Sequence, residues 1–261
     1  MIWVGLPAYN EGARIKRLLI EIDKNIGKKE DDYTIIVYDD GSSDDTAARV
    51  LAVREQGVKV QLIGGGINRG LGHALKSLIL HFSRVSSLED TVIIMDADVT
   101  HSPGHIHRML SYIQDGFDIV IASRYTPYSR VIGLKIYRQI LSYIASLIFK
   151  SLFSIKGVFD YTCAYRAYTA KILKLGEEIY KDQLVEETGF ACMAEVLIKL
   201  RKLGITACEV PLILRYDKKT GPSAMNVSAT ILGTLRLILR SLFLSHPPAE
   251  ELHKLKEHLE L

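Results

Sequence analysis

Two carboxylates one residue apart, Asp96 and Asp98, directly follow the apolar run 92–95. A short aliphatic run bounded by polar residues is typical of a buried strand. In an open α/β sheet, ligands bind at the carboxyl ends of the parallel strands. Paired carboxylates at such an end suit Mg²⁺ or Mn²⁺, ions that usually also bind substrate phosphates. The alternative is that both acids only cap the helix that follows.

Polar and acidic residues also follow two earlier strand-like runs, 2–6 and 34–38. If these strands are parallel to the run before Asp96, all three ends share one edge of a sheet. That arrangement favours one binding site over scattered helix caps. The first of these runs ends in residues 7–11, and the second ends in Asp39 and Asp40.

Strand-like and helix-like segments alternate over the first 125 residues. The strands are expected near 2–6, 34–38, 58–63, 91–95 and 118–122. The helices are expected near 11–26, 44–55, 71–85 and 103–114. This alternation predicts βαβ units, and therefore an α/β fold with a mostly parallel central sheet flanked by helices. A further helix is expected near 188–203 and a strand near 206–213.

A glycine-rich loop, 64–72, lies between the third strand and its helix. Glycines allow the backbone to approach a phosphate or sugar closely, and Arg69 within the loop offers a positive charge. A flexible turn explains the glycines equally well. The order of the glycines matches neither a P-loop nor a dinucleotide-binding fingerprint.

Two later segments, 126–159 and 218–249, contain basic residues and no acidic ones. The first predicts an amphipathic helix over 135–155, and the second predicts another with its stripe around Ile231 and Leu235. Basic amphipathic helices are typical of membrane surfaces. The alternative is that both apolar stripes pack against the sheet.

Composition narrows the class of protein. The first 125 residues carry a net charge of −3 and the remainder +6, together the chain's +3, which favours an anionic partner for the second part. The three cysteines are far apart and form no CxxC pair, as expected in a reducing compartment. Neither a signal peptide nor a membrane-spanning run is evident, so we expect a cytoplasmic protein at the membrane surface. We expect no nucleic-acid partner, and a homodimer is left open.

The order of these motifs resembles the family 2 inverting glycosyltransferases of GT-A fold. The later segments are similar to the branch of dolichyl-phosphate mannosyltransferases and other polyprenyl-phosphate glycosyltransferases. The segments that carry the resemblance are 7–11, 39–46, 68–72, 96–98, 123–125, Arg138 with Ser142, 160–166, 189–190 with Glu195, and 221–223.

The resemblance implies a role for each candidate residue. Asp96 and Asp98 would hold Mg²⁺ or Mn²⁺ on the donor's diphosphate, and Arg124 would stand beside the transferred sugar or the phosphates. Arg138 and Ser142 would grip the acceptor's phosphate. The nucleotide-binding residues would be Pro7, Tyr9, Glu11, Asp40, Arg69, Asp96 and Lys218.

The activity implied is transfer of a sugar from a nucleotide-diphosphate sugar, such as GDP-mannose or a UDP-hexose, to a polyprenyl or dolichyl monophosphate. A hydroxyl acceptor is the first alternative, and it needs a carboxylate base such as Glu186 or Glu187. A haloacid-dehalogenase-like phosphatase is the second, because residues 96–100 fit its Asp-x-Asp-x-Thr motif. We expect a transferase domain over 1–225, followed by an amphipathic helix and a charged tail over 226–261.

Overall fold

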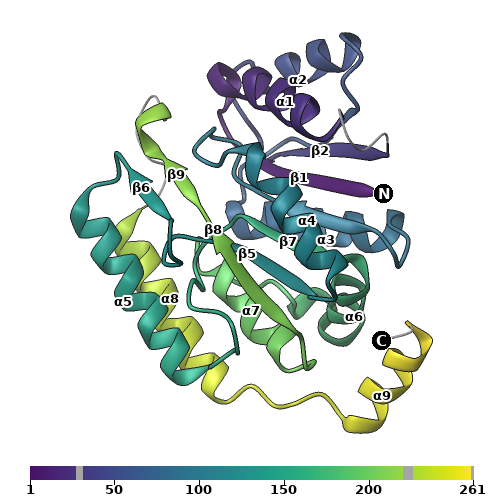
Figure 1. Cartoon of the computed structure of the whole chain (residues 1–261), viewed down its shortest axis with the longest axis vertical. Coiled ribbons are helices and arrows are strands. Elements are labelled where there is room, and N and C mark those ends of the chain that lie inside the picture. Colours follow the sequence, from purple (N-terminus) through teal and green to yellow (C-terminus); the bar gives the residue numbers. More distant parts are fainter. Residues whose placement is uncertain (28–31, 220–225, 260–261) are drawn as a thin grey trace.

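The computed structural model describes residues 1–27, 32–219 and 226–259. The strands of its main sheet are β1 (Ile2–Ala8), β2 (Tyr33–Asp39), β3 (Val60–Gly64), β4 (Thr91–Ile94), β5 (Ile119–Ser123), β7 (Arg166–Thr169) and β8 (Ala207–Pro211). They lie in the order β3-β2-β1-β4-β7-β5-β8 (Figure 1). The five strands expected in the first 125 residues are all present, each within two residues of its expected ends.

The main sheet is mostly parallel, as the sequence predicts. β1 pairs in parallel with both β2 and β4, β2 pairs in parallel with β3, and β5 pairs in parallel with β8. Because β1, β2 and β4 run the same way, the residues that follow them meet at one edge of the sheet. This edge is where the candidate site is built.

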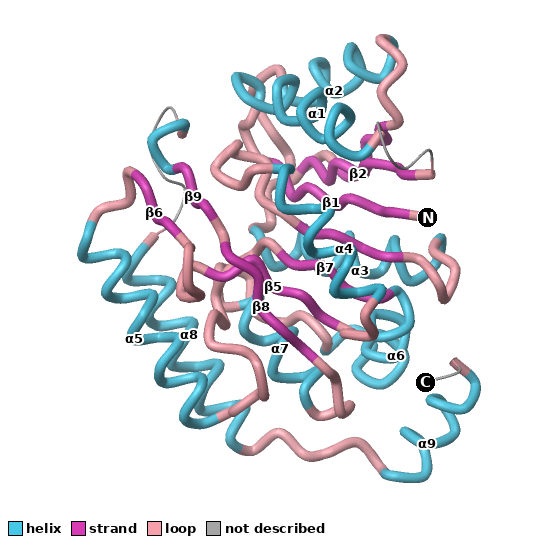
Figure 2. Tube along the Cα trace, in the orientation of Figure 1, coloured by secondary structure: helices cyan, strands magenta, loops and turns pink. Residues whose placement is uncertain are grey.

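Helices cover both faces of the sheet (Figure 2). Their bounds are α1 (Gly12–Ile26), α2 (Thr46–Glu55), α3 (Leu71–Val85), α4 (Ile106–Gln114), α6 (Ala170–Tyr180) and α7 (Cys192–Arg201). Helix α1 contacts α2 and α4 on one side, while α3 contacts α6 and α7 on the other. In α1 the buried residues recur every three or four positions, from Ile15 through Leu18, Leu19 and Ile22 to Ile26, as one face of a helix requires.

Strand β7 and helix α6 are absent from the sequence-based expectations. β7 is inserted antiparallel between β4 and β5. It begins with Arg166, whose side chain is fully buried and donates hydrogen bonds to the carbonyl oxygens of Tyr161 and Met193. A strand of four residues that opens with a buried arginine lacks the apolar pattern by which strands are recognised.

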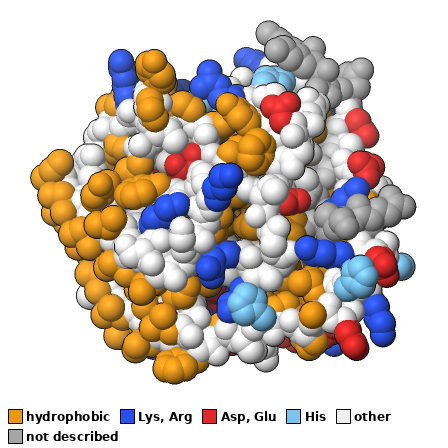
Figure 3. Space-filling model, turned by 60° about the horizontal axis from the view of Figure 1, so that its bottom comes forward, with side chains coloured by type: hydrophobic (Ala, Val, Ile, Leu, Met, Phe, Trp, Pro, Cys, Tyr) orange, Lys and Arg blue, Asp and Glu red, His pale blue; other side chains and the backbone are white. Residues whose placement is uncertain are grey.

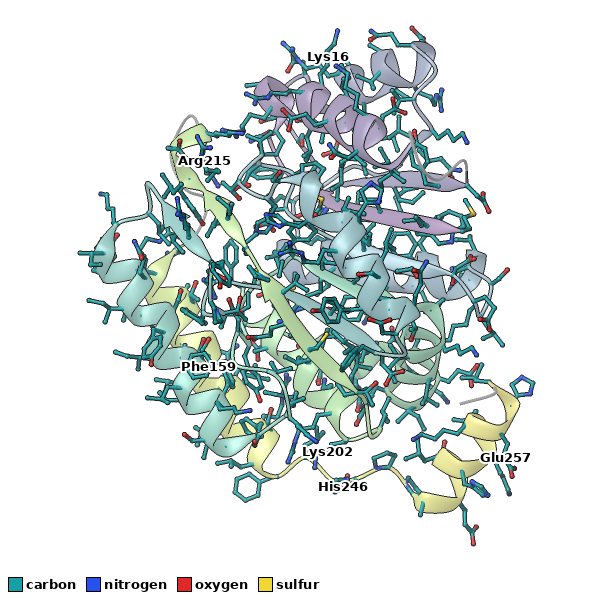
Figure 4. The ribbon with its side chains drawn as sticks, in the orientation of Figure 1. Lys16, Phe159, Lys202, Arg215, His246 and Glu257 are labelled. Atoms are coloured by element: carbon teal, nitrogen blue, oxygen red, sulfur yellow. The ribbon has the colours of Figure 1, made fainter. Side chains whose placement is uncertain are left out.

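A second, small sheet joins β6 (Arg130–Ile132) to β9 (Ile213–Arg215) in parallel. The backbone N–H of Arg215 donates to the Thr100 carbonyl at 3.0 Å, so β9 is tied to the turn that carries Asp96 and Asp98. Arg215, labelled in Figure 4, forms a two-point ion pair with Asp217. The small sheet thereby fixes the start of the segment that follows it, residues 216–219, beside the strand ends.

Helices α5 (Ile136–Leu152) and α8 (Val227–Leu242) lie side by side at one side of the molecule (Figures 1 and 2). Aromatic contacts attach α5 to the body of the protein, because Tyr143 packs on Tyr125 and on Phe159, which Figure 4 labels. After α8 the chain crosses to α9 (Ala249–His258), which contacts α6. None of the helices in the described part of the chain is long and apolar enough to cross a bilayer.

Candidate active site

The ends of β1, β2 and β4 open into one cavity of about 530 Å³. Six of the residues proposed from the sequence line it: Pro7, Tyr9, Glu11, Asp40, Asp96 and Asp98. The floor therefore comes from the sheet edge, as the motif order predicts. Helix α8 contributes the opposite wall through residues that include Gly233 and Arg236.

Asp40 organises the loop between β3 and α3. Its carboxylate accepts hydrogen bonds from the backbone N–H groups of Arg69 at 3.1 Å and Gly70 at 2.7 Å. Gly72 donates its N–H to the Thr188 carbonyl, and a Cβ at Gly72 would lie 1.7 Å from the Glu187 carbonyl oxygen. Gly72, at the start of α3, is thus needed because the backbone of residues 187–188 approaches it closely. Residues 187–188 form part of the cavity wall.

Asp98 is held on both of its oxygens. Oδ1 accepts from the Thr100 hydroxyl at 2.6 Å and from the Thr100 N–H at 3.1 Å, while Oδ2 accepts from the Lys219 ammonium at 2.6 Å. Burial alone would raise the pKa of Asp98, but the charge and hydrogen bonds of Lys219, together with the Thr100 hydroxyl, lower it. Asp98 is therefore a carboxylate with a bound cation.

Asp96 lies in different surroundings. Burial, together with repulsion from Asp98, raises the pKa of Asp96 to about 7. His101 accepts a hydrogen bond from the Asp96 N–H on Nδ1, and its Nε2 lies 3.9 Å from the Asp96 carboxylate. Burial also lowers the pKa of His101 to about 4, which keeps the ring neutral. Asp96 thus lacks the strong cationic partner that Asp98 has.

The turn that follows these acids is strained at Val99, whose φ is 60°. A β-branched residue rarely adopts positive φ, because its side chain crowds the backbone, and such strain is concentrated at functional sites. The turn brings Asp96 and Asp98 to the same cavity.

The residues present fit a divalent ion that takes much of its coordination from substrate. Two carboxylates, which are hard oxygen donors, line the same cavity, and burial followed by repulsion from Asp98 raises the pKa of Asp96. Among the described residues, no group of three or more His, Cys, Asp or Glu side chains could hold a metal. Mg²⁺ and Mn²⁺ sites at nucleotides are commonly built in this way, from one or two carboxylates plus phosphate oxygens.

A second cavity of about 260 Å³ lies between α5, α8 and the sheet edge, and Asp96 borders both cavities. Arg124, Arg138 and Ser142 all line it, so the sequence-proposed acceptor residues come together. The rest of the lining is largely apolar and includes Leu141, Ile144, Ile148, Ile231, Leu235 and Ile238.

The two arginines of this cavity are held differently. Arg124 is fixed by a two-point ion pair with Asp160, at 2.6 and 2.8 Å, and by the Thr162 hydroxyl. The guanidinium of Arg138 lies 5.6 Å from the centre of the Tyr216 ring. Tyr216 lines both cavities and therefore stands between them.

Comparison with known proteins assigns the chain to a family. The sequence model described as glycosyl transferase family 2 matches residues 3–175, well over half of the chain. The chain belongs to glycosyl transferase family 2. The match includes Asp96 and Asp98, so it assigns these two acids to a glycosyltransferase motif and not to the phosphatase motif.

Relatives in this family include three curated transferases. They are the dolichol-phosphate mannosyltransferase of Pyrococcus furiosus (29% identity, 74% of this chain, 51% of the relative), the polyprenol monophosphomannose synthase of Mycolicibacterium smegmatis (28%, 85% and 80%) and the undecaprenyl-phosphate 4-deoxy-4-formamido-L-arabinose transferase of Klebsiella pneumoniae (29%, 65% and 49%). The chain thus spans about half the length of the first and third.

Solved structures support the same fold. Glucosyl-3-phosphoglycerate synthase of Mycobacterium tuberculosis, crystallised with Mn²⁺, UDP and its product, superposes with a TM-score of 0.63 at 17% identity. The match covers 94% of this chain and 81% of that one. The fold of this family 2 chain is accordingly the expected GT-A arrangement.

Two of the proposed nucleotide-binding residues are absent from the described lining of both cavities. The Arg69 side chain is exposed and lies 3.4 Å from His73, so only its backbone contributes, through Asp40. Lys218 is absent from both linings, and its neighbour Lys219 lines the first cavity instead. The motif residues 221–223 lie outside the described residues.

Glu195, a carboxylate in an apolar helix, proves to be structural. It accepts from the N–H groups of Glu186 and Glu187 and from the ammonium of Lys199, and it pairs with Arg240 of α8. This fixes the 186–189 wall of the first cavity. Of the two candidate bases, Glu187 lines that cavity, and neither borders the described part of the Arg138 cavity.

Proposed function

We propose that this chain is an inverting, metal-dependent glycosyltransferase that moves a sugar from a nucleotide-diphosphate sugar to a polyprenyl monophosphate at a membrane surface. One observation carries the proposal: a large cavity at the strand ends and a smaller, mostly apolar cavity between α5 and α8 meet at Asp96. Donor and acceptor would thereby react across the boundary between the two cavities.

The donor would occupy the first cavity. Tyr9, 42% exposed, and Pro7 offer surfaces for the base, while Asp40 and Glu11 offer acceptors for ribose hydroxyls. The sugar would project toward Asp96, where the two cavities meet. A divalent ion on Asp96 and Asp98 would neutralise the charge that develops on the leaving diphosphate.

The acceptor would enter the second cavity with its phosphate toward Arg138, Ser142 and Arg124. A phosphate monoester is already ionised near neutral pH, so its oxygen attacks without a general base. The protein's contribution is then to position the two reactants and to balance their charge.

Exposed apolar side chains support action at a membrane. On α5, Ile136 is 70% exposed and Ile140 52%, and on α8, Leu239 is 63% exposed, with Phe243 just beyond at 87%. Figure 3 shows hydrophobic side chains gathered on the left of the view, the side where these helices lie. Most residues of the two predicted stripes are exposed as well, although Ile238 is buried. An exposed apolar surface of this kind is typical of a membrane or protein contact. We propose an anionic membrane surface, because exposed Arg130 and Lys135 flank α5.

The test is a transfer assay with GDP-mannose and UDP-hexoses, a polyprenyl phosphate and Mn²⁺, read as sugar recovered in the organic phase and identified by mass spectrometry. We expect a sugar-phosphoprenol with at least one donor, and its loss on addition of EDTA. Asp98→Asn should lower turnover by about 10²-fold or more, because it removes a charged ligand without removing core packing. Transfer only to saccharide hydroxyls, or full turnover by Asp98→Asn, would overturn the proposal.

A further inference from the structure

Lys219 occupies the position on Asp98 that a divalent cation would use. Its ammonium lies 2.6 Å from Asp98 Oδ2, and its side chain is only 14% exposed. It also lies 5.9 Å from the centre of the Tyr216 ring. Lys219 is thus enclosed in the donor-side cavity by an acid and an aromatic ring.

Both partners of this ion pair carry their charge. Burial would lower the pKa of Lys219, but attraction to Asp98 outweighs it and raises that pKa. The other oxygen of Asp98 already accepts two hydrogen bonds from Thr100. The ammonium of Lys219 therefore competes with any divalent ion that would bind the less occupied oxygen, Oδ2.

Asp96 and Asp98 together carry up to two negative charges, and Lys219 supplies one positive charge to them. A bound diphosphate brings further negative charge into the same cavity, and lysine is a flexible point charge that can move from one anionic partner to another. Exchange of Lys219 for a divalent ion would then place two positive charges on the aspartates and one on the diphosphate, so that each anionic group has a cation beside it.

We infer that Lys219 is an internal counter-cation, which holds Asp98 in the absence of substrate, gives it up to the divalent ion, and then pairs with the donor's diphosphate. This inference rests on the proposed function, because it needs a nucleotide diphosphate in the first cavity. It assigns to Lys219 the diphosphate role that the sequence resemblance gives to Lys218. It also predicts that the metal and the nucleotide each strengthen binding of the other. The metal frees Lys219 for the diphosphate, and the diphosphate draws Lys219 away from Asp98.

The test is the affinity for Mn²⁺ alone, measured by electron paramagnetic resonance of the free ion, in the wild type, K219M, K219R and K218M. K219M lacks the competing ammonium and should bind Mn²⁺ about tenfold more tightly, a change of roughly 1.4 kcal/mol. K219R keeps a cation on Asp98 and K218M keeps Lys219, so both should bind as the wild type does. K219A is the second neutral variant, and circular dichroism establishes that each variant is folded.

The second measurement repeats the titration with UDP or GDP present. The nucleotide should strengthen Mn²⁺ binding in the wild type by a larger factor than in K219M, which has no ammonium to transfer to the diphosphate. Equal Mn²⁺ affinity in folded K219M, K219A and wild type would overturn the exchange. If the wild type still transfers sugar, the proposed function survives that result. A gain of Mn²⁺ affinity in K219M without sugar transfer by the wild type would support the exchange at Asp98 and overturn the function.

Discussion

Asp96 and Asp98 leave the same strand, yet their surroundings shift their proton affinities in opposite directions. Burial and repulsion from Asp98 raise the pKa of Asp96, whereas Lys219 lowers that of Asp98 despite its burial. Carboxylates with such divergent environments are common at functional sites. Lys219, which is far from both acids in the sequence, contributes most to lowering the pKa of Asp98.

Arg138 provides the first prediction at this scale. Arg138→Ala should raise the KM for polyprenyl phosphate, or lower kcat, by about 10-fold to 100-fold, because a charged hydrogen bond is worth about 1.5–3 kcal/mol. The donor's Kd, measured by calorimetry, should change little, because Arg138 lines only the second cavity. Arg138→Lys keeps the charge and should retain part of the activity. Loss of donor affinity with unchanged acceptor kinetics would contradict the acceptor role.

The sequence predicts the site well where residues follow strand ends, and poorly where they come from loops. Asp40 and Arg124 follow their strands directly, and Asp96 follows β4 after one residue, so the parallel strands bring them to one edge of the sheet. Lys218 and Lys219 share a short turn after β9, and local spacing does not determine which ammonium faces the cavity. The backbone bond from Arg215 to Thr100 fixes that orientation, and it depends on tertiary structure.

At the scale of elements, periodicity predicts that a helix forms more reliably than it predicts what the apolar face of that helix contacts. The sequence predicts the apolar stripe of α5, but it allows that stripe either to face a membrane or to pack against the sheet. In the structure Ser146 and Phe149 face inward and are fully buried, while Ile136 and Ile140 face outward. Strand β7 was missed because Arg166, its first residue, breaks the apolar pattern, and only the enclosing carbonyls of Tyr161 and Met193 make that burial tolerable.

Glu195 provides the prediction at this scale, because it joins α7 to α8 and to the cavity wall. Glu195→Ala leaves Lys199 in a buried site with fewer partners. It also removes the carboxylate that accepts hydrogen bonds from two backbone N–H groups. Removing one partner of a buried ion pair costs about 3–5 kcal/mol, so the free energy of unfolding should fall by about that amount in urea titrations. Glu178→Ala, an exposed glutamate on α6, is the control and should change it by less than about 0.5 kcal/mol. Equal stability of the two variants would show that the network does not anchor α8.

At the scale of the whole molecule, the two ends of the reaction path face different surroundings. The cavity proposed for the nucleotide is formed by strand ends, loops and one wall from α8, whereas the cavity proposed for the acceptor opens between two helices whose outer faces are apolar. A water-soluble donor and a lipid acceptor can therefore approach from different directions and meet at Asp96. The +6 charge of residues 126–261 adds attraction to anionic lipid on the same half of the chain.

This arrangement predicts binding to vesicles that contain phosphatidylglycerol. Ile136→Glu together with Phe243→Glu should weaken binding by more than about tenfold in flotation assays, since burial of each apolar side chain contributes about 1.5–3 kcal/mol. Leu51→Glu, an exposed apolar residue on α2 away from this surface, should have no effect. High salt should release part of the protein, because screening removes the contribution of the basic residues and leaves that of the apolar ones. If the wild type ignores vesicles at every salt concentration but forms a dimer that the α5 and α8 substitutions disrupt, the apolar face is an interface between two copies of the chain, and the acceptor must reach Arg138 by another path.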